Sequence, residues 1–201
     1  MREERQFTEG APTCEAPVQD EQTACPPGTA PVFYNTKMEF NRDMTVLLLS
    51  CISPENYLDA MAATGVRGLR VSHETGIPAI INDRDPAAVA MIEENAERIG
   101  GDIRVTCDDA NRLMCTERFD AIDLDPFGTP APFLDAASRS AKRYLFVTAT
   151  DTAPLCGAHL KAGLRRYFAT PKNTEYHAEV GLRMMMGAMA KELVKYDRGM
   201  E

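Results

Sequence analysis

Residues 122–128, Ile-Asp-Leu-Asp-Pro-Phe-Gly, join an apolar run to an acid, a proline and an aromatic ring. Asp125 can accept a hydrogen bond from an N–H group, and Phe127 can stack on a flat ring. Pro126 ends a strand and stiffens the turn between them, because its ring fixes φ and it has no N–H to donate. Residues just past the carboxyl ends of strands bind ligands in open α/β sheets. The segment therefore predicts a site for a planar nitrogen compound.

Three more polar segments follow predicted strands. Residues 59–70, Asp-Ala-Met-Ala-Ala-Thr-Gly-Val-Arg-Gly-Leu-Arg, lead into a helix, and their small side chains let a ligand approach the N–H groups at its start. Asp83 closes the next strand, where nucleoside-binding α/β proteins place a carboxylate on ribose hydroxyls. Asp109 and Ala110 follow the third strand and can hold an adenine edge through a carboxylate and a backbone N–H. Together the segments predict a nucleoside site.

Each of these segments also has a purely structural explanation. Tight strand-to-helix turns use glycine for steric reasons alone. Asp83 can help Asp85 to cap the following helix, and Asp109 can cap the short helix after it. The combination of four strand ends is more specific than any one of them.

Arg67 favours S-adenosylmethionine over a dinucleotide. A dinucleotide needs a G-x-G-x-x-G turn under its pyrophosphate, whereas residues 63–68 read Ala-Thr-Gly-Val-Arg-Gly. S-adenosylmethionine has no phosphates, and an arginine suits its carboxylate. An NAD-dependent oxidoreductase is the less favoured alternative.

The elements that position these residues alternate between strand and helix along the chain. We expect strands near 57–61, 77–82, 103–107, 119–124 and 143–149. We expect helices near 66–75, 86–99, 110–115, 131–140, 157–168 and 175–196. This alternation predicts a doubly wound, Rossmann-like α/β fold, with a parallel sheet covered by helices on both faces. Only five strands are expected, so the sheet is expected to lack edge strands.

Two segments precede the first of these strands. Residues 1–31 are rich in Pro, Glu, Thr and Gln and are expected to form an irregular arm before a domain at 32–201. A helix of about three turns is expected from Asn41, with its apolar face made by Met44, Leu47, Leu48 and Ile52.

Composition limits the function classes. The chain has 201 residues and a formal net charge of −8, which argues against a surface that is basic all over. Its six cysteines include no C-x-x-C pair, and its three histidines have no zinc-ligand spacing, so we expect no metal site. No run is long and apolar enough for a signal peptide or membrane span, and the cysteine pattern suits a reducing compartment. A cytoplasmic location is expected.

The motifs together resemble those of the tRNA guanine-26 N2-dimethyltransferase family, in order and spacing, from about Phe33 to the last helix. The segments that carry the resemblance are Val-Phe-Tyr-Asn-Thr-Lys-Met-Glu-Phe-Asn-Arg-Asp at 32–43, the stretch 59–70, Asn82-Asp83, Asp-Ala-Asn at 109–111, and Asp-Leu-Asp-Pro-Phe-Gly at 123–128.

The resemblance implies a class I methyltransferase that uses S-adenosylmethionine to place one or two methyl groups on the exocyclic N2 of a tRNA guanine. It implies that Arg42 and Arg67 hold the methionine end of the donor, Asp83 its ribose, and Asp109 with Ala110 its adenine. It assigns catalysis to Asp125, with the Pro126 carbonyl as a second acceptor, and the grip on the base to Phe33 and Phe127.

These assignments leave structural alternatives. Phe33 and Phe127 are equally suited to a core, Arg42 to a surface, and Asp123 to shaping the site or pairing with an arginine. A phosphate-facing strip is predicted from Lys142-Arg143, Lys161, Arg165-Arg166 and Lys172, although scattered surface charge explains these residues almost as well. Residues 184–189, rich in Met, favour core or interface packing.

Family members usually continue beyond the length of this chain, so the domain is expected to be incomplete at its C-terminus. An unfinished sheet edge predicts self-association unless another chain covers it. Two alternatives to tRNA methylation follow: a domain that binds the donor without methylating tRNA by itself, or an N-methyltransferase acting on adenine or a glutamine amide.

Overall fold

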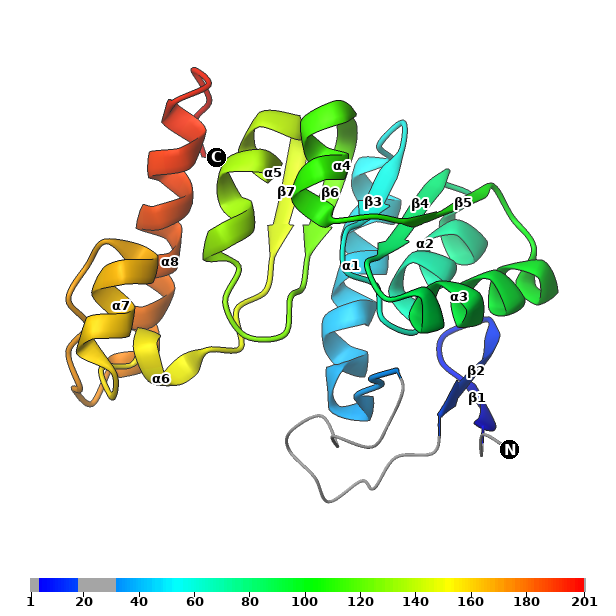
Figure 1. Ribbon diagram of the computed structural model, residues 1–201, viewed down its shortest axis with the longest axis horizontal. Helices are drawn as coiled ribbons and strands as arrows, with labels where there is room; N and C mark the ends of the chain where they lie inside the picture. Colours follow the sequence, from blue (N-terminus) through cyan, green and yellow to red (C-terminus); the bar gives the residue numbers. More distant parts are fainter. Residues whose placement is uncertain (1–3, 18–31, 201) are drawn as a thin grey trace.

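The computed structural model describes residues 4–17 and 32–200. Five parallel strands form one sheet with the order β5-β4-β3-β6-β7 (Figure 1). The strands are β3 (Tyr57–Asp59), β4 (Ala79–Asp83), β5 (Ile103–Cys107), β6 (Phe119–Leu124) and β7 (Ala141–Val147). The predicted α/β fold with a parallel, doubly wound sheet is confirmed.

Helices cover both faces of the sheet. One face contacts α1 (Glu39–Ile52), α2 (Val66–Thr75) and α3 (Pro86–Ile99). The other contacts α4 (Ala110–Thr116) and α5 (Leu134–Ser140), the latter preceded by the 3-10 turn η2 (Ala131–Phe133). Beyond β7 lie α6 (Thr152–Leu155), α7 (Leu160–Tyr167) and α8 (His177–Val194), which pack on one another at one end of the molecule (Figure 1).

Successive side chains of each strand point to opposite faces of the sheet, so the sheet has a separate hydrophobic core on each face. Tyr57 and Ile81 point into the α1–α3 face, whereas their neighbours Leu58 and Ile80 point into the α4–α5 face. Side chains in a strand alternate between faces with a period of two, so a strand buried on both sides needs an apolar residue at every position. The apolar runs in the sequence meet this requirement.

The order of the strands fixes where a ligand can bind. The chain runs outward from β3 to β4 and β5, then returns to place β6 on the other side of β3. Crevices at the carboxyl ends of strands open at such a reversal, because the connections on its two sides leave in opposite directions. Here the reversal lies between β3 and β6, which end at Asp59 and Leu124.

The predicted bounds coincide with α2, α3, β5 and β6, and they lie within a few residues of the observed ends elsewhere. The helix expected near 157–168 is α7, and the short helix α6 before it was not predicted; the two are separated by a turn in which Gly157 has φ +95°. A positive φ cannot continue a right-handed helix, so the chain breaks there.

The expectation that residues 1–31 are irregular is wrong for residues 4–17. These form an antiparallel hairpin of β1 (Glu4–Thr8) and β2 (Thr13–Pro17), in which Cys14 and Ala16 are fully buried. The buried Asn95 of α3 acts as a substitute strand neighbour, since its amide bonds both the N–H and the C=O of Glu15 at 2.8 and 3.0 Å. The rest of the predicted arm, residues 18–31, lies outside the described residues, and the domain boundary at 31 stays a prediction.

The first helix also differs from its prediction. It begins at Glu39, directly after the 3-10 turn η1 (Thr36–Met38), and its buried stripe is Arg42, Thr45, Val46 and Leu49. The residues expected to face inward include Met44, Leu47 and Leu48, which are exposed. The inward face is partly polar because it meets charged groups of the site described below. Apolar periodicity alone therefore selected the wrong face.

Two glycines test how closely α2 packs on the sheet. A Cβ at Gly68 would lie 2.7 Å from Ile81 Cγ1, whereas a Cβ at Gly187 in α8 would meet no atom within 4 Å. We expect Gly68→Ala to lower the free energy of unfolding by roughly 1–3 kcal/mol through overpacking, although alanine is the better helix former. We expect Gly187→Ala to raise it by about 0.5–1 kcal/mol. Urea unfolding of both variants measures this, and stabilisation by Gly68→Ala would contradict the close packing.

Candidate functional site

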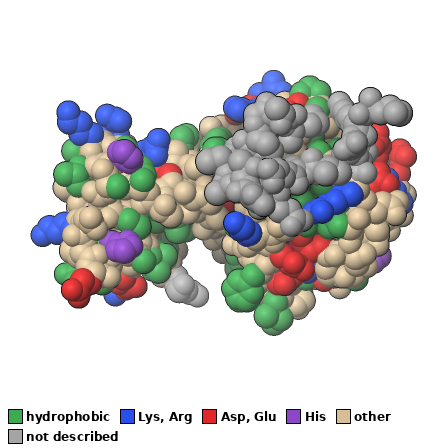
Figure 2. Space-filling model, turned by 90° about the horizontal axis from the view of Figure 1, so that it is seen from below, with side chains coloured by type: hydrophobic (Ala, Val, Ile, Leu, Met, Phe, Trp, Pro, Cys, Tyr) green, Lys and Arg blue, Asp and Glu red, His purple; other side chains and the backbone are tan. Residues whose placement is uncertain are grey.

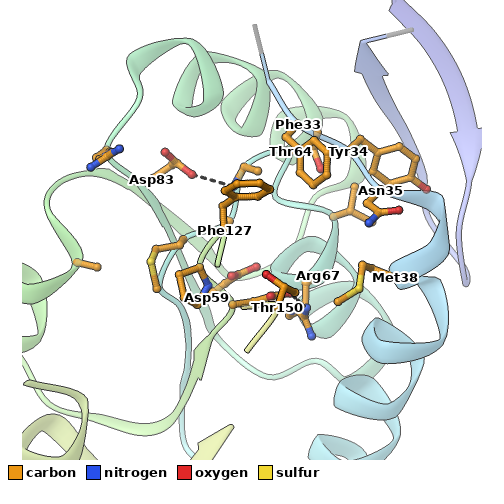
Figure 3. Close-up of a pocket in the computed structure, with 18 of the residues that line it drawn as sticks. Phe33, Tyr34, Asn35, Met38, Asp59, Thr64, Arg67, Asp83, Phe127 and Thr150 are labelled. Atoms are coloured by element: carbon orange, nitrogen blue, oxygen red, sulfur yellow. Dashed lines mark hydrogen bonds and ion pairs between the residues drawn. The ribbon is translucent and has the colours of Figure 1, made fainter. Parts of the chain in front are cut away.

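All nine residues predicted for the site line one cavity of about 650 Å³ at the carboxyl ends of the strands (Figure 3). They come from six separate segments of the chain: Phe33, Arg42, Arg67, Asp83, Asp109-Ala110 and Asp125-Pro126-Phe127. A cavity of this size lies within the range of small-molecule and cofactor sites. The predicted grouping is therefore present.

Asn82 holds three strand ends in register beneath the cavity. Its buried side chain donates to the carbonyls of Ala60 and Asp108, both at 3.0 Å. Its Oδ1 accepts from Thr106 Oγ1 and from the N–H of Asp108. All four hydrogen-bonding positions of the amide are used, so the residues after β3, β4 and β5 are fixed relative to one another.

Asp83 and Asp109 have structural roles as well as places in the cavity. Asp83 Oδ2 accepts from the N–H of Ala63 at 2.8 Å, across the turn between β3 and α2 (Figure 3). Asp85 caps α3, and Asp83 Oδ1 accepts from its N–H. Asp109 caps α4 by accepting from the N–H of Arg112 at 3.1 Å. The capping explanations are thus confirmed for Asp85 and Asp109, and Asp83 and Asp109 both line the cavity.

Arg67 is the buried charge at the centre of the site. Its guanidinium donates to Asp123 Oδ2 at 3.2 Å, to Thr45 Oγ1 at 2.8 Å and to Asp125 Oδ2. The Asp125 side chain keeps about a fifth of its surface exposed, whereas Asp123 is almost fully buried. The expectation that Asp123 shapes the site or pairs with an arginine is confirmed, and the arginine is Arg67.

This cluster contains more acid than base. Asp59 is buried beside Arg67 and accepts the Gly68 N–H at 3.1 Å. Burial raises the pKa of Asp59 to about 7, although the charge of Arg67 opposes the shift. Burial likewise raises the pKa of Asp123 against the opposing charge of Arg67. One guanidinium therefore lies among three acids, of which Asp59 and Asp125 line the cavity.

Arg42 is held by the hairpin rather than left as a surface cation. Its Nε and Nη2 donate to the two carboxylate oxygens of Glu9 at 2.6 and 2.5 Å. Burial acts to raise the pKa of Glu9, but hydrogen bonds and charge from Arg42 outweigh it and lower that pKa. Tyr34 and Arg70 also donate to Glu9, which is 2% exposed. The hairpin thus fixes one wall of the cavity.

Phe33 and Phe127 meet across the cavity mouth. Their ring centroids lie 6.2 Å apart with an interplanar angle of 77°, and Phe127 is 72% exposed (Figure 3). An exposed aromatic ring at a cavity rim is not core packing, so the alternative placement of Phe127 in the core is wrong. Phe33 is half-buried and faces its partner edge-on. The two rings can contact a flat ligand that enters the mouth.

Several residues of the site were not predicted, among them Thr129, Pro132 and Phe133 of the cavity lining. Thr150 lines the cavity just after β7, and Glu9 positions Arg42 from the hairpin. The rule that pointed to the ends of four strands also points to the end of the fifth, so Thr150 could have been found. Glu9 was not found, because its contact with Arg42 joins residues 33 positions apart and local patterns do not report such a contact.

The predicted phosphate-facing strip is not continuous. Lys142 and Arg143 begin β7, at the opposite end of the sheet from the cavity, and Arg143 pairs with Asp120. Lys161 and Arg165 are exposed on α7, in the part of the molecule whose outer side carries several Lys and Arg side chains (Figure 2). Lys142 and Arg143 lie at the amino end of β7, whereas Lys161 and Arg165 lie on α7, which follows the carboxyl end of that strand. Only the α7 residues can therefore lie near the cavity.

Within residues 4–17 and 32–200, no group of three or more His, Cys, Asp or Glu side chains is arranged to hold a metal ion. Over the same residues, no helix has the length and apolar character needed to cross a membrane.

Comparison with known proteins identifies the family. A model of the family described as "N2,N2-dimethylguanosine tRNA methyltransferase" matches residues 13–201. The chain belongs to this family. The family match covers the hairpin strand β2, the sheet and all the residues predicted for the site.

Archaeal members of the N2,N2-dimethylguanosine tRNA methyltransferase family align over almost the whole chain. The tRNA (guanine(26)-N(2))-dimethyltransferase of Methanocorpusculum labreanum is 78% identical over 197 residues, which are 98% of this chain and 52% of the relative. The enzyme of the same name from Methanoregula boonei is 64% identical over 194 residues, or 96% of this chain and 52% of the relative. The chain thus spans about half the length of the curated relatives it matches.

A solved structure shows the same architecture. Trm1 from Pyrococcus horikoshii, in complex with S-adenosyl-L-methionine, superposes with a TM-score of 0.87 at 39% identity. The match covers 98% of this chain and 56% of that one. A tRNA m1G37 methyltransferase from M. jannaschii, 13% identical with a TM-score of 0.56, shares the fold alone.

The shifted pKa of Asp59 predicts a specific pH dependence. Its pKa of about 7 in the folded state exceeds the unfolded value of about 3.9, so the folded state binds the extra proton between pH 4 and 7. The Asp59 contribution to stability is present below pH 4 and is lost as the pH rises through 7. Asparagine cannot titrate, yet its oxygen can still accept the Gly68 N–H.

We therefore expect Asp59→Asn to gain stability relative to the parent chain between pH 4 and 8, by up to about 4 kcal/mol. Urea unfolding at several pH values measures the difference. The exposed Asp102→Asn is the control and should show no such trend. Parallel stability curves for Asp59→Asn and the parent chain would show that Asp59 titrates normally.

Proposed function

We propose that this chain transfers methyl groups from S-adenosylmethionine to the exocyclic N2 of guanine 26 in tRNA. The observation that carries the proposal is the single cavity in which Asp83, Asp109 and Arg67 meet Asp125 and Phe127. The first three are the types needed for a nucleoside with a carboxylate, and the last two are the types needed for a flat base with an N–H group. Family membership names both ligands.

The residues of the cavity fit the donor. Asp83 is the last residue of β4 and Asp109 follows β5, so ribose and adenine would lie over adjacent strand ends. Arg67 makes three hydrogen bonds to described residues and has five N–H groups, which leaves it able to bind a carboxylate. Arg42 is more fully engaged by Glu9 and Asn35, so we assign the larger share of carboxylate binding to Arg67.

Asp125 is suited to the acceptor side of the reaction. S-adenosylmethionine supplies an electrophilic methyl group on its sulfonium. The guanine N2 lone pair is delocalised into the ring and is a weak nucleophile. Asp125 would accept a hydrogen bond from N2–H and so direct the lone pair toward the methyl group. As the N–C bond formed, the methyl–sulfur bond would break, the sulfur would leave as a neutral thioether, and the N2 proton would pass to Asp125. The ion pair with Arg67 orients this carboxylate.

Pro126 and the two phenylalanines complete the acceptor site. The Pro126 carbonyl is available for the second N2–H, because proline itself offers only an acceptor. Phe33 and Phe127 flank the mouth, where base stacking worth roughly 1–3 kcal/mol would offset removal of the guanine from its own stack. Adenine and glutamine amide substrates share the planar nitrogen and are the substrate alternatives.

A second candidate function has an observation in its favour. The chain spans about half the length of its curated relatives, and all the residues predicted for the donor and acceptor sites lie within that half. In this alternative the chain binds S-adenosylmethionine but does not methylate tRNA by itself. The five cysteines within the described residues are free, which supports a reducing, cytoplasmic location for either function.

The central test is methylation of unmodified tRNA by the chain. Incubation with S-adenosylmethionine, followed by digestion to nucleosides, should yield N2-methylated guanosine. Asp125→Ala should lower the rate by roughly 10²–10⁴-fold, the usual effect of removing a catalytic acid or base. A tRNA with adenine at position 26 should not be methylated.

Asp135→Asn provides a matched control. Asp135 is an exposed acid on α5, paired with Lys195 at 3.3 Å and absent from the cavity lining, so its loss should leave the rate unchanged. Equal rates for Asp125→Ala and the parent chain would overturn the assignment of Asp125. Donor binding without any methylation by the parent chain would favour the second candidate function.

A further inference from the structure

The loop that carries Asp125 and Phe127 is fastened at its far end by residues after β7. Gly128 donates its N–H to Thr150 Oγ1 at 2.9 Å, and its carbonyl accepts from the N–H groups of Thr150 and Asp151 at 3.0 and 3.2 Å. Gly128 has φ +96°, a conformation that a residue with a side chain rarely adopts. Both backbone polar groups of Gly128, its N–H and its C=O, are therefore hydrogen-bonded to residues after β7. They fix the end of the loop 125–129, which we call the acceptor loop.

A chain of hydrogen bonds continues from this point into α7. Tyr167 donates its hydroxyl hydrogen to Asp151 Oδ1 at 2.5 Å, because a carboxylate can only accept. Tyr167 lies 3.0 Å from Thr129 Oγ1, and its one hydrogen is already used, so Thr129 must donate to it. Arg166 donates to the other Asp151 oxygen at 3.0 Å. The donor and the acceptor of each hydrogen bond in this network are therefore defined.

The α7 end of this network is buried although it lies beside an open cavity, whereas the Gly128–Thr150 hydrogen bond is exposed. Tyr167 is 1% exposed and the Asp151 side chain is 6% exposed, while Thr129 and Thr150 line the cavity itself. Burial and the hydrogen bond to Asp151 raise the pKa of Tyr167, so its hydroxyl stays a donor at any working pH. Hydrogen bonds shielded from water hold their geometry better than exposed ones. The network therefore braces the loop at 125–129 against α7.

We infer that Tyr167 and Asp151 are positioning residues for the acceptor base. Neither touches the base; they act through Thr129 and Gly128 to fix the loop that presents Asp125 and Phe127. A catalytic carboxylate must be held closely, because a small misplacement of reacting groups costs far more in rate than in binding. This inference rests on the proposed function of Asp125, and its test has a readout that does not need methyl transfer.

The variant Tyr167→Phe removes one hydroxyl and keeps the buried ring. We expect kcat for tRNA methylation to fall roughly tenfold to a hundredfold, with KM for tRNA and donor affinity nearly unchanged. Thr129→Val, which removes the neighbouring hydroxyl, should have a similar effect. The double variant should lose little more than either single one, because both break the same network. Thermal unfolding of each variant identifies losses that come from unfolding alone.

Tyr196→Phe is the matched control. Tyr196 also donates its hydroxyl to an aspartate, Asp135, at 3.2 Å, but it lies just past α8 and outside the cavity lining. Its loss should change neither kcat nor the loop. Equal effects of Tyr167→Phe and Tyr196→Phe would overturn the inference, and so would an unchanged kcat in Tyr167→Phe.

A fluorescent reporter tests whether Tyr167 holds the loop 125–129 in place, even if the chain methylates no tRNA. The sequence contains no tryptophan, so Phe127→Trp places a single reporter on the acceptor loop. In that background, Tyr167→Phe should lower the fluorescence anisotropy of the tryptophan as the loop gains nanosecond motion. Tyr196→Phe should leave it unchanged. If Tyr167→Phe also leaves the anisotropy unchanged, the loop is held by other contacts and the inference fails.

Discussion

Arg67 lies buried at the carboxyl ends of β3 and β6, with Asp59, Asp123 and Asp125 around it. A buried guanidinium must be paired, since leaving it unpaired would cost several kcal/mol of desolvation free energy. Its partners come from strands on both sides of the reversal in strand order. The same ion pairs that keep Arg67 stable therefore join the donor half of the cavity to the acceptor half, and Asp125 is oriented as a consequence.

The remaining contacts extend this arrangement outward. Asn82 fixes the ends of β3, β4 and β5, so the acids that follow them keep their spacing. Glu9 brings the hairpin against α1 and holds Arg42 at the cavity wall. Tyr167 and Asp151 brace the acceptor loop from the other side. Buried polar side chains, each with partners, position the site, while the two apolar cores support the sheet beneath it.

Much of this could be predicted from the sequence, because the relevant signals are local. Alternating apolar runs and helix caps such as Asp85 and Asp109 predicted the positions of most elements. The rule that ligands bind at the carboxyl ends of parallel strands predicted the residues that line the cavity. The failures involved contacts between distant segments. The hairpin depends on Asn95 of α3, and the inward face of α1 depends on Arg67 and Asp123, about 20 and 80 residues away. Periodicity cannot report a buried face that is polar.

The most direct test of the account is equilibrium binding of S-adenosylmethionine, measured by calorimetry on the chain and on Asp83→Asn. Asp83 lines the cavity at the end of β4, whereas the exposed Asp102 precedes β5 at the opposite end of the sheet. We predict that Asp83→Asn weakens donor binding roughly tenfold to a hundredfold, the effect of losing a charged hydrogen-bond acceptor, and that Asp102→Asn does not. Equal donor affinity in all three proteins would contradict the placement of the donor at the strand ends.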